Sequence, residues 1–303
     1  MGARALNLAL LAAAATGVQV GAAIVASRFA VAEVPPLTLA MLRYAIGFCC
    51  LLPFAVPALR AMRTLPPARD LLAMAALGTG QFGILIALLN AGLRTVPAAP
   101  AALLFSLFPL LTLLLAAALG REQFSLRLLA GVLLSIAGVA VSLLPKLHGA
   151  HGGSWWGELA VLASACVGAL CSVLYRPYLQ RYPTVPVSAF AMLASVLFLA
   201  AIASGEDWPA RLRGVSPPAW GAVAFVGLSS GIGYFWWLYA LKHESPTRVT
   251  VFLALNPVTA ALLGWSLLGE PLPAQMLGAL VLIAAGLALA TWPPSAKRQA
   301  APG

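Results

Sequence analysis

Charged residues are scarce in this sequence, and their scarcity decides the class of protein. Asp, Glu, Lys and Arg make up 9% of the 303 residues, whereas hydrophobic residues make up 62%. Such a chain has too few polar side chains to cover a folded domain in water. A water-soluble domain is therefore excluded, and the composition predicts a protein that is embedded in a lipid bilayer.

Acidic side chains are missing from the apolar segments, and so are the usual signatures of catalysis. The eight Asp and Glu residues fall in predicted loops or at segment ends, with Glu158 the nearest to a segment interior. The sequence has no HExxH zinc motif and no GxxxxGK[ST] phosphate loop. Its three histidines lie in predicted loops, and its four cysteines lie inside apolar segments. We therefore expect no enzyme activity, no metal site and no cofactor.

Ten apolar segments of about 20 residues follow one another, and this is the length that a helix needs to cross a bilayer. Approximate bounds are 5–28, 37–57, 71–93, 98–119, 126–144, 155–176, 185–204, 219–241, 247–268 and 273–292. The sequence therefore predicts an all-α integral membrane protein with ten transmembrane helices.

Residues that lie 148 positions apart are repeatedly of the same kind, which indicates an internal repeat. Examples are Arg28 with Arg176, Pro109 with Pro257, Glu122 with Glu270, and Gly138 with Gly286. Each repeat holds five predicted helices, and because five is odd, the second repeat enters the membrane inverted. We predict a first repeat at 1–147, a linker at 148–154, a second repeat at 155–292 and a cytoplasmic tail at 293–303.

Basic residues are unevenly divided between the two sides of the predicted membrane. Arg60, Arg63 and Arg69 exemplify the richer side, which carries both chain termini, whereas the other side carries few basic residues, such as Arg28 and Arg94. By the positive-inside rule both termini are cytoplasmic, in a multi-pass protein of the cytoplasmic (inner) membrane. The net charge of +10 is explained by these loops, so we expect no nucleic-acid partner.

Inverted repeats are typical of secondary transporters. Two similar halves of opposite orientation give inward-open and outward-open states of nearly equal energy. The pattern thus predicts a carrier for a small-molecule solute that works by alternating access. The alternative is that the duplication built a scaffold with some other task, since fold alone does not decide function.

Pro109 and Pro257 lie inside the fourth and ninth predicted helices. A proline removes a backbone donor and clashes with the carbonyl four residues before it, so each helix is expected to kink. Kinks at equivalent positions are suitable walls for a central site. They are equally well explained as packing kinks whose freed carbonyls neighbouring helices satisfy.

Polar side chains inside the predicted helices should face the protein interior, because amides and charges are costly in lipid. A hydrogen bond between helices explains each one singly, whereas the whole set favours the lining of a cavity. Arg43 would hold a carboxylate of the solute or, alternatively, extend to the membrane surface. The predicted substrate-binding residues are Thr16, Gln19, Arg43, Thr79, Gln81, Ser106, Ser229, Ser230, Tyr234, Trp237, Asn256 and Thr259.

Two ordered copies of a short pattern resemble a known family. The pattern runs from Leu107-Phe-Pro109 to Gly138 in the first copy and from Leu255-Asn-Pro257 to Gly286 in the second. Together with the run from Glu33 to Arg43, it resembles EamA-type members of the drug/metabolite transporter superfamily. The resemblance covers nearly the whole chain. It implies an inner-membrane carrier, often an exporter of amino acids or related metabolites, with a cavity between its halves.

The chain departs from the family pattern at two places. Val20 stands where many members carry tryptophan, and Arg121 separates Gly120 from Glu122 in the first copy, whereas Gly269 and Glu270 are adjacent. We expect Glu122 and Glu270 to cap the helices that follow them.

Several alternatives remain open from the sequence. The solute would be a nucleotide sugar or another phosphorylated metabolite if more basic residues faced the cavity. From a different class, the protein would be a membrane scaffold or a membrane-embedded enzyme. The lipid bilayer is an obligatory partner, and a homodimer is left open.

Overall fold

The fold is described by a computed structural model that covers residues 3–60, 66–120, 126–147, 154–243, 252 and 255–291. This part of the chain contains helices and no strand, so the all-α prediction is confirmed for it. The first half comprises α1 (Ala3–Ala30), α2 (Pro36–Arg60), α3 (Ala68–Gly78), η1 (Thr79–Ile84), α4 (Leu85–Gly92), α5 (Ala98–Phe105), α6 (Phe108–Ala118) and α7 (Leu126–Leu147). The second comprises α8 (Trp156–Arg181), α9 (Thr184–Ala203), η2 (Ser204–Glu206), α10 (Trp208–Arg211), η3 (Leu212–Gly214), α11 (Pro217–His243), α13 (Leu255–Leu268) and α14 (Ala274–Thr291).

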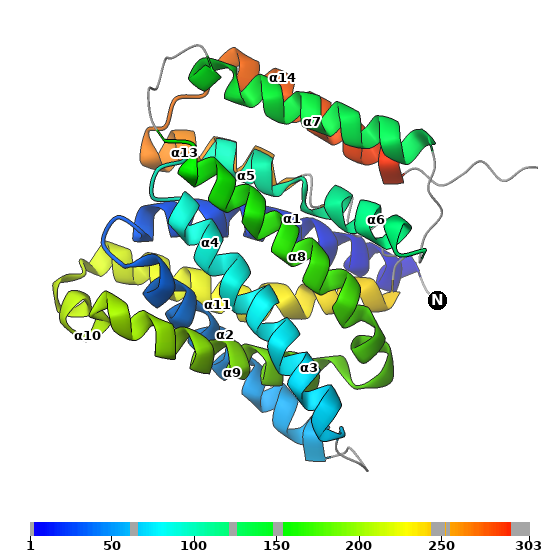
Figure 1. Cartoon of the computed structure of the whole chain (residues 1–303), viewed down its shortest axis with the longest axis vertical. Helices are drawn as coiled ribbons and strands as arrows, with labels where there is room; N and C mark the ends of the chain where they lie inside the picture. Colours follow the sequence, from blue (N-terminus) through cyan, green and yellow to red (C-terminus); the bar gives the residue numbers. More distant parts are fainter. Residues whose placement is uncertain are drawn as a thin grey trace, which may run out of the picture.

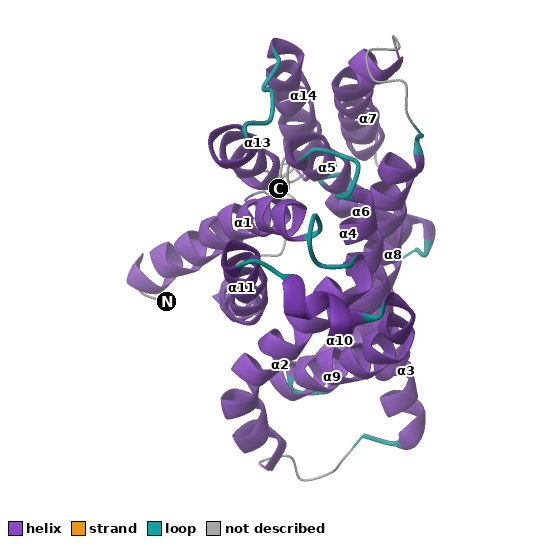
Figure 2. Cartoon of the chain, turned by 90° about the vertical axis from the view of Figure 1, so that its left-hand side faces the viewer, coloured by secondary structure: helices purple, strands orange, loops and turns teal. Residues whose placement is uncertain are grey.

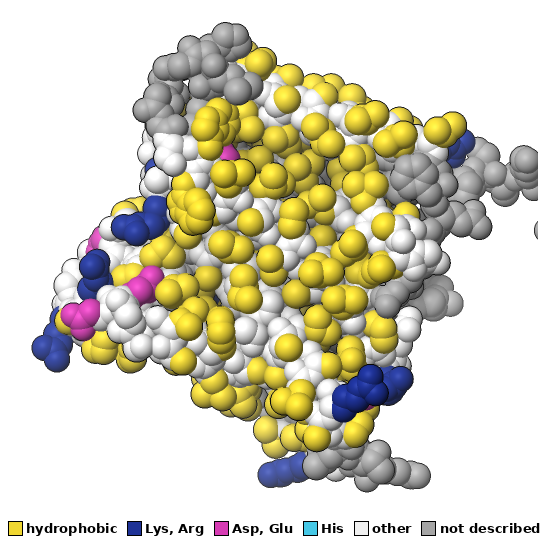
Figure 3. All heavy atoms as spheres, viewed as in Figure 1, with side chains coloured by type: hydrophobic (Ala, Val, Ile, Leu, Met, Phe, Trp, Pro, Cys, Tyr) yellow, Lys and Arg dark blue, Asp and Glu magenta, His cyan; other side chains and the backbone are white. Residues whose placement is uncertain are grey.

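Six stretches of the described chain are long and apolar enough to cross a bilayer. They are Leu11–Ala30, Pro36–Arg60, Ala68–Gly92, Ala98–Ala118, Trp156–Tyr175 and Thr184–Glu206. Hydrophobic side chains cover the middle of the face in Figure 3, while charged side chains gather at its left and lower right edges. The chain is therefore a multi-pass membrane protein. The full count of ten spans stays a prediction, because Leu129–Leu144, Leu255–Leu268 and Ala274–Gly286 are shorter apolar helices.

The helix contacts of one half recur in the other. Helix α1 packs against α11 and α13, as its counterpart α8 packs against α4 and α6. Helix α2 packs against α11, as its counterpart α9 packs against α3. Two further pairs join counterparts directly: α2 with α9, and α7 with α14, which lie side by side at the top of Figures 1 and 2. Exchanging the two halves therefore maps these contacts onto one another.

The pairing of α7 with α14 shows this equivalence at single residues. A methyl group on Gly138 would collide with Ile283, and one on Gly286 would collide with Ser135. Both residues of one contact lie 148 positions from those of the other. The offset in the sequence thus relates packing contacts as well as residue types, and small residues let these two helices approach closely.

Counterpart helices run in opposite directions. Helix α1 ends at the turn that holds Leu93, where Arg28 donates to the Leu93 carbonyl. Helix α8 begins at this same turn, because Gly157 lies against Thr95. In Figure 1, α1 begins and α14 ends at the right-hand side of the molecule. We call the end with Arg28 the Glu270 end and the opposite end, where α3 begins and α8 finishes, the Asp70 end.

A break between two helices lies just before Pro109. Helix α5 ends at Phe105, and α6 begins at Phe108, so the interruption falls at the carbonyl that the proline ring would meet. Pro257 is the third residue of α13, and Leu253 and Ala254 before it lie outside the described residues. The kink expected there stays a prediction. Gly120 and Gly269, which follow α6 and α13, both have a positive φ, of 66° and 65°.

Candidate functional site

Helices from both halves bring six side chains together in the interior of the bundle. We call this group the polar–aromatic cluster. It consists of Arg43 and Tyr44 from α2, Phe82 from η1, Ser188 from α9, and Ser230 and Tyr234 from α11. The cluster forms because α2 and α11 approach closely: an added Cβ on Gly231 would lie 2.7 Å from the Cβ of Cys50.

Arg43 points toward the middle of α11. Its Nε–H donates to the Oγ of Ser230 at 2.7 Å, and its guanidinium carbon lies 5.6 Å from the centre of the Tyr44 ring. Ser230 is the fourteenth of the 27 residues in α11. The side chain therefore lies against the middle of α11, and its role in holding a carboxylate of the solute stays a prediction.

Three aromatic rings continue the cluster from α2 to α11. The Tyr44 and Phe82 ring centres are 5.2 Å apart, and the Phe82 and Tyr234 centres are 6.3 Å apart with an edge-to-face geometry. The Tyr234 hydroxyl lies 2.6 Å from the Oγ of Ser188. One cluster thus presents a cation, hydroxyl groups and ring faces, with contributions from both halves.

Gln81 lies beside the cluster, on a π-helical turn. Residues Thr79–Ile84 form this turn between α3 and α4, and Thr79 begins it. The hydroxyl of Ser172 on α8 donates to the Oε1 of Gln81 at 3.4 Å. A π-helical turn within an α-helix re-aims side chains and is frequent at functional sites, so the turn brings a second polar contact between the halves close to Phe82.

The other predicted residues take different positions. Three hydroxyls bond to a backbone carbonyl three or four residues before them: Thr16 donates to Ala12, Ser106 to Leu103, and Ser229 to Val226. These three are therefore satisfied locally and do not join the cluster. The side chain of Trp237 lies outside the described part of the structure.

Gln19, Asn256 and Thr259 lie at contacts of α1. Gln19 rests against Gly233 of α11, while Asn256 and Thr259 of α13 rest against Gly21. Asn256 is 3% exposed, and its Oδ1 has no partner among the described residues. These residues form a second polar region, at the contacts of α1 with α11 and α13.

Sequence reasoning missed Tyr44, Phe82, Ser188 and Ser172. Tyr44 and Phe82 directly follow Arg43 and Gln81 in the chain, and that adjacency to predicted polar residues was the available signal. Nothing in the sequence pattern distinguishes the two serines from other serines of apolar segments, because their role depends on how the helices rotate against one another.

The run from Gly227 to Gly231 has the GxSxG spacing of a hydrolase nucleophile. That motif works on a sharp turn between a strand and a helix. Here it lies inside the continuous helix α11, and the Ser229 hydroxyl donates to the carbonyl of Val226 at 3.0 Å. The spacing therefore does not place a nucleophile.

In the described residues, no group of three or more His, Cys, Asp or Glu is arranged to hold a metal ion.

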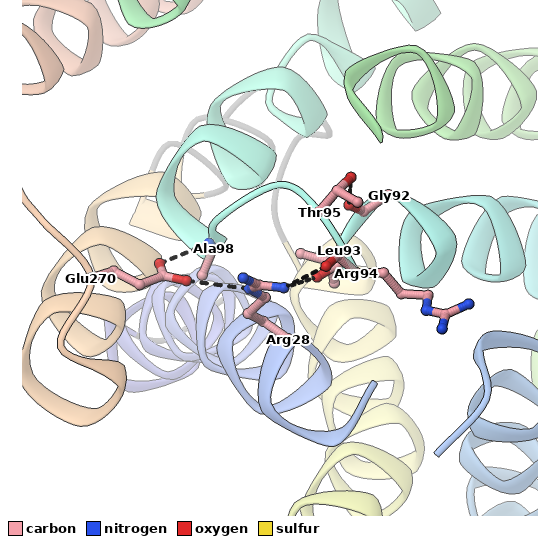
Figure 4. Close-up of polar contacts among 7 residues, drawn as sticks. All are labelled: Arg28, Gly92, Leu93, Arg94, Thr95, Ala98 and Glu270. Carbon is pink, nitrogen blue, oxygen red and sulfur yellow. Dashed lines mark hydrogen bonds and ion pairs between the residues drawn. The ribbon is translucent and has the colours of Figure 1, made fainter. Parts of the chain in front are cut away.

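Glu270 joins the halves at its end of the bundle (Figure 4). Its Oε2 accepts from the backbone N–H of Ala98 at 2.8 Å, and its Oε1 lies 3.4 Å from the Nε of Arg28. Arg28 also donates to the carbonyls of Leu93 at 2.6 Å and Arg94 at 3.0 Å. The expectation that Glu270 caps the helix after it was wrong: it accepts from the first backbone N–H of α5 in the other half. Glu122 lies outside the described residues.

Two more carboxylates cap helices across the halves at the Glu270 end. Glu206 accepts from the backbone N–H groups of Leu37 and Thr38 at the start of α2, at 3.1 and 2.8 Å. Glu33 accepts from the N–H and hydroxyl of Ser216, both at 2.7 Å, just before α11. These bonds from Ser216, with the backbone donor dominant, hold the pKa of Glu33 below its ordinary value.

Asp70 makes the corresponding contact at the opposite end. Its Oδ2 accepts from the Tyr182 hydroxyl at 2.5 Å and lies 3.1 Å from Nη1 of Arg181. Asp70 belongs to the first turn of α3, and Arg181 ends α8, so this contact also joins the halves. The hydrogen bond to Asp70 raises the pKa of Tyr182.

Both halves of the chain match one family model. The model of the EamA-like transporter family matches residues 7–144 and again residues 155–292. The chain belongs to this family. The membership accounts for the repeated helix contacts, and it identifies the protein as a membrane transporter whose partners are a small-molecule solute and the lipid bilayer.

Several relatives of this EamA-like transporter are named as transporters. A protein of Streptantibioticus cattleyicolor, named "Probable terminal-alkyne amino-acid exporter", is 33% identical over 72% of this chain and 73% of its own length. The "Uncharacterized inner membrane transporter YedA" of Escherichia coli is 31% identical over 81% of this chain and 78% of its own. A solved crystal structure, 26% identical, matches with a TM-score of 0.67 over 93% of this chain and 96% of its own.

Proposed function

We propose that this EamA-like transporter is a ten-helix secondary carrier of the cytoplasmic (inner) membrane, with both termini cytoplasmic. Its inverted repeats comprise residues 1–147 and 155–292, joined by the linker 148–154. The supporting observation is the polar–aromatic cluster, which both halves build between helices whose main contacts recur when the halves are exchanged. When the two halves swap their conformations, an inward-open state becomes an outward-open state of similar energy, as alternating access requires.

In the described conformation the Glu270 end is tied across the halves by Glu33, Glu206 and Glu270. We assign this end to the outer side of the membrane, because α1 and α14 place the termini at the other end. Transport then requires these contacts to break while the halves close at the Asp70 end. The predicted site residues near the path are Arg43, Thr79, Gln81, Ser230 and Tyr234.

The proposed solutes are amino acids or related small metabolites that leave the cell. The name of the Streptantibioticus cattleyicolor relative supports amino-acid export. The chemistry of the cluster supports it as well, since a guanidinium and hydroxyl groups bind polar ends while ring faces bind apolar bodies. A nucleotide sugar or other phosphorylated metabolite is less well matched, because Arg43 is the basic side chain that the described residues bring to the cluster.

Counterflow in proteoliposomes tests the proposal. Vesicles that contain the purified protein and a high internal concentration of an unlabelled amino acid should accumulate the same labelled amino acid, without ATP. Tyr234→Ala should reduce exchange about tenfold or more, because it removes a ring of the cluster and the partner of Ser188. Leu72→Ala is the matched control, since Leu72 is an exposed side chain on α3. No exchange with amino acids, phosphorylated metabolites or other small solutes would contradict transport and favour a scaffold.

A further inference from the structure

Arg43 brings a positive charge into the bundle, and the acceptor beside it is neutral. The Arg43 Nε–H donates to the Oγ of Ser230, whose own hydroxyl proton goes to the carbonyl of Val226 at 2.7 Å. Ser230 thus supplies a lone pair but no charge. At 1.5 Å per residue, it lies about 20 Å along α11 from the first residue of that helix.

This guanidinium has no counter-charge among the described residues. An arginine carries five N–H groups, and the described acceptors of Arg43, the hydroxyls of Ser230 and Tyr44, are both neutral. The described acidic residues lie at helix ends or in connections, and Glu33, Asp70, Glu206 and Glu270 bind partners there. An unpaired charge in a poorly hydrated interior is costly. An anion that bound at Arg43 would relieve this cost, and a carboxylate fits the two parallel N–H groups of the guanidinium edge.

The surroundings of Arg43 suit an apolar body next to that carboxylate. The Tyr44 ring lies beside the guanidinium, and Phe82 and Tyr234 extend the aromatic surface toward α9. The cluster contains no Asp or Glu, so it offers no ion-pair partner to an ammonium group. Its recognition of an amino acid is therefore one-sided, with charge complementarity for the carboxylate alone.

We infer that this transporter selects solutes by a carboxylate bound at Arg43 and does not require an ammonium group. The inference rests on the proposed function and names its substrate class: monocarboxylates with an apolar body, which include amino acids, N-acyl amino acids and 2-oxo acids. Amines and amides that lack the carboxylate are rejected, because they leave the charge of Arg43 unpaired.

Ligand binding to the purified full-length protein in lipid nanodiscs tests this inference. The probes are phenylalanine, N-acetylphenylalanine, phenylpyruvate and phenylalaninamide, with Kd measured through intrinsic tryptophan fluorescence. The three carboxylates should bind with similar Kd values, and the amide should bind about ten- to a hundredfold more weakly, as expected for loss of a charge-assisted hydrogen bond. The inference is overturned if the amide binds as tightly as the acid, if N-acetylation abolishes binding, or if none of the carboxylates binds.

Variants locate the effect at the proposed residue. Arg43→Gln should weaken carboxylate binding about ten- to a hundredfold and leave amide binding unchanged, and Arg43→Lys should retain part of the preference for carboxylates. Arg94→Gln is the matched control: it makes the same change in charge at an exposed arginine whose side chain points away from Glu270 in Figure 4. Carboxylate binding by Arg43→Gln at the wild-type Kd would overturn the inference. If Arg43→Gln does not fold, the Kd values of phenylalanine and phenylalaninamide for the wild-type protein decide whether the inference holds.

Counterflow on the same protein separates this inference from the proposed function. Binding of carboxylates without exchange would contradict transport and leave the selection by Arg43 standing. Exchange that proceeds equally well with phenylalanine and phenylalaninamide would confirm transport and overturn the selection.

Discussion

At the Glu270 end of the bundle, three carboxylates reach from one half of the chain to backbone N–H groups of the other. At the Asp70 end, the described contact between the halves instead joins side chains: Asp70, Arg181 and Tyr182. The two ends are equivalent in the repeat, because Arg181 lies 148 positions after Glu33. The same place in the two copies therefore carries opposite charges.

This difference bears on how firmly each end is closed. A carboxylate at a helix N-terminus satisfies backbone donors that have no partner within the helix, and it interacts favourably with the helix dipole. Glu270 also has an arginine partner, and its side chain is 13% exposed. The side chain of Arg181, by contrast, is 64% exposed, so water weakens its attraction to Asp70. We therefore expect the Glu270 end to be the more costly one to open.

The largest effect is expected from Glu270→Gln. The variant loses the charge opposite Arg28 and weakens the bond to the Ala98 N–H, so the free energy of unfolding should fall by about 1–3 kcal/mol. Thermal or denaturant unfolding in detergent measures the change. Asp207→Asn is the matched control, because Asp207 is an exposed carboxylate at this end and asparagine tolerates its positive φ of 49°. Equal stability of Glu270→Gln and wild type would remove the contrast between the ends.

Asp70→Asn should have a smaller effect. It retains an acceptor for the Tyr182 hydroxyl and loses the attraction to Arg181, which water screens because the Arg181 side chain is exposed. The same unfolding assay compares it with Glu270→Gln, and Arg181→Gln should reproduce the loss. If Asp70→Asn costs more than Glu270→Gln, the ranking of the two ends is wrong.

The smallest effect is expected from Glu33, and it should depend on pH. The folded pKa of this carboxylate is lowered, so its contribution to stability is present above its ordinary pKa and is lost as the pH falls through the folded value. Melting temperatures of wild type and Glu33→Gln should differ slightly at pH 7, with the wild type higher, and should converge under acidic conditions. A difference that persists unchanged at the lowest pH at which the protein stays folded would exclude the carboxylate as its cause.

Much of the fold could be predicted from the sequence because its causes are local. Apolar length predicts helices, and Pro109 indicates an interruption near the residue four positions before it, where α5 ends at Phe105. Gly138 and Gly286 mark a close helix contact because a larger residue would not fit there. Arg43 was singled out because a charge inside an apolar segment requires a partner.

The cluster itself could be predicted only in part. In a membrane protein both the lipid-facing and the core-facing residues are apolar, so the sequence does not reveal which side of a helix faces its neighbours. Tyr44 and Phe82 therefore resembled other aromatic residues of apolar segments. Glu270 was assigned to the helix after it, because local capping is the commoner arrangement, whereas its partners Arg28 and Ala98 depend on how distant segments pack.

Accessibility of Gln81 from the two sides of the membrane tests alternating access most directly. The four native cysteines would be replaced, a single cysteine placed at Gln81, and its labelling by an impermeant maleimide measured in right-side-out and inside-out vesicles. Glu270→Gln should raise the labelling rate from the Glu270 end and lower it from the Asp70 end, because the two states exclude one another. Transport by alternating access would be contradicted if Glu270→Gln raised the labelling rates from both sides. It would also be contradicted if the rate from one side changed and the rate from the other side did not.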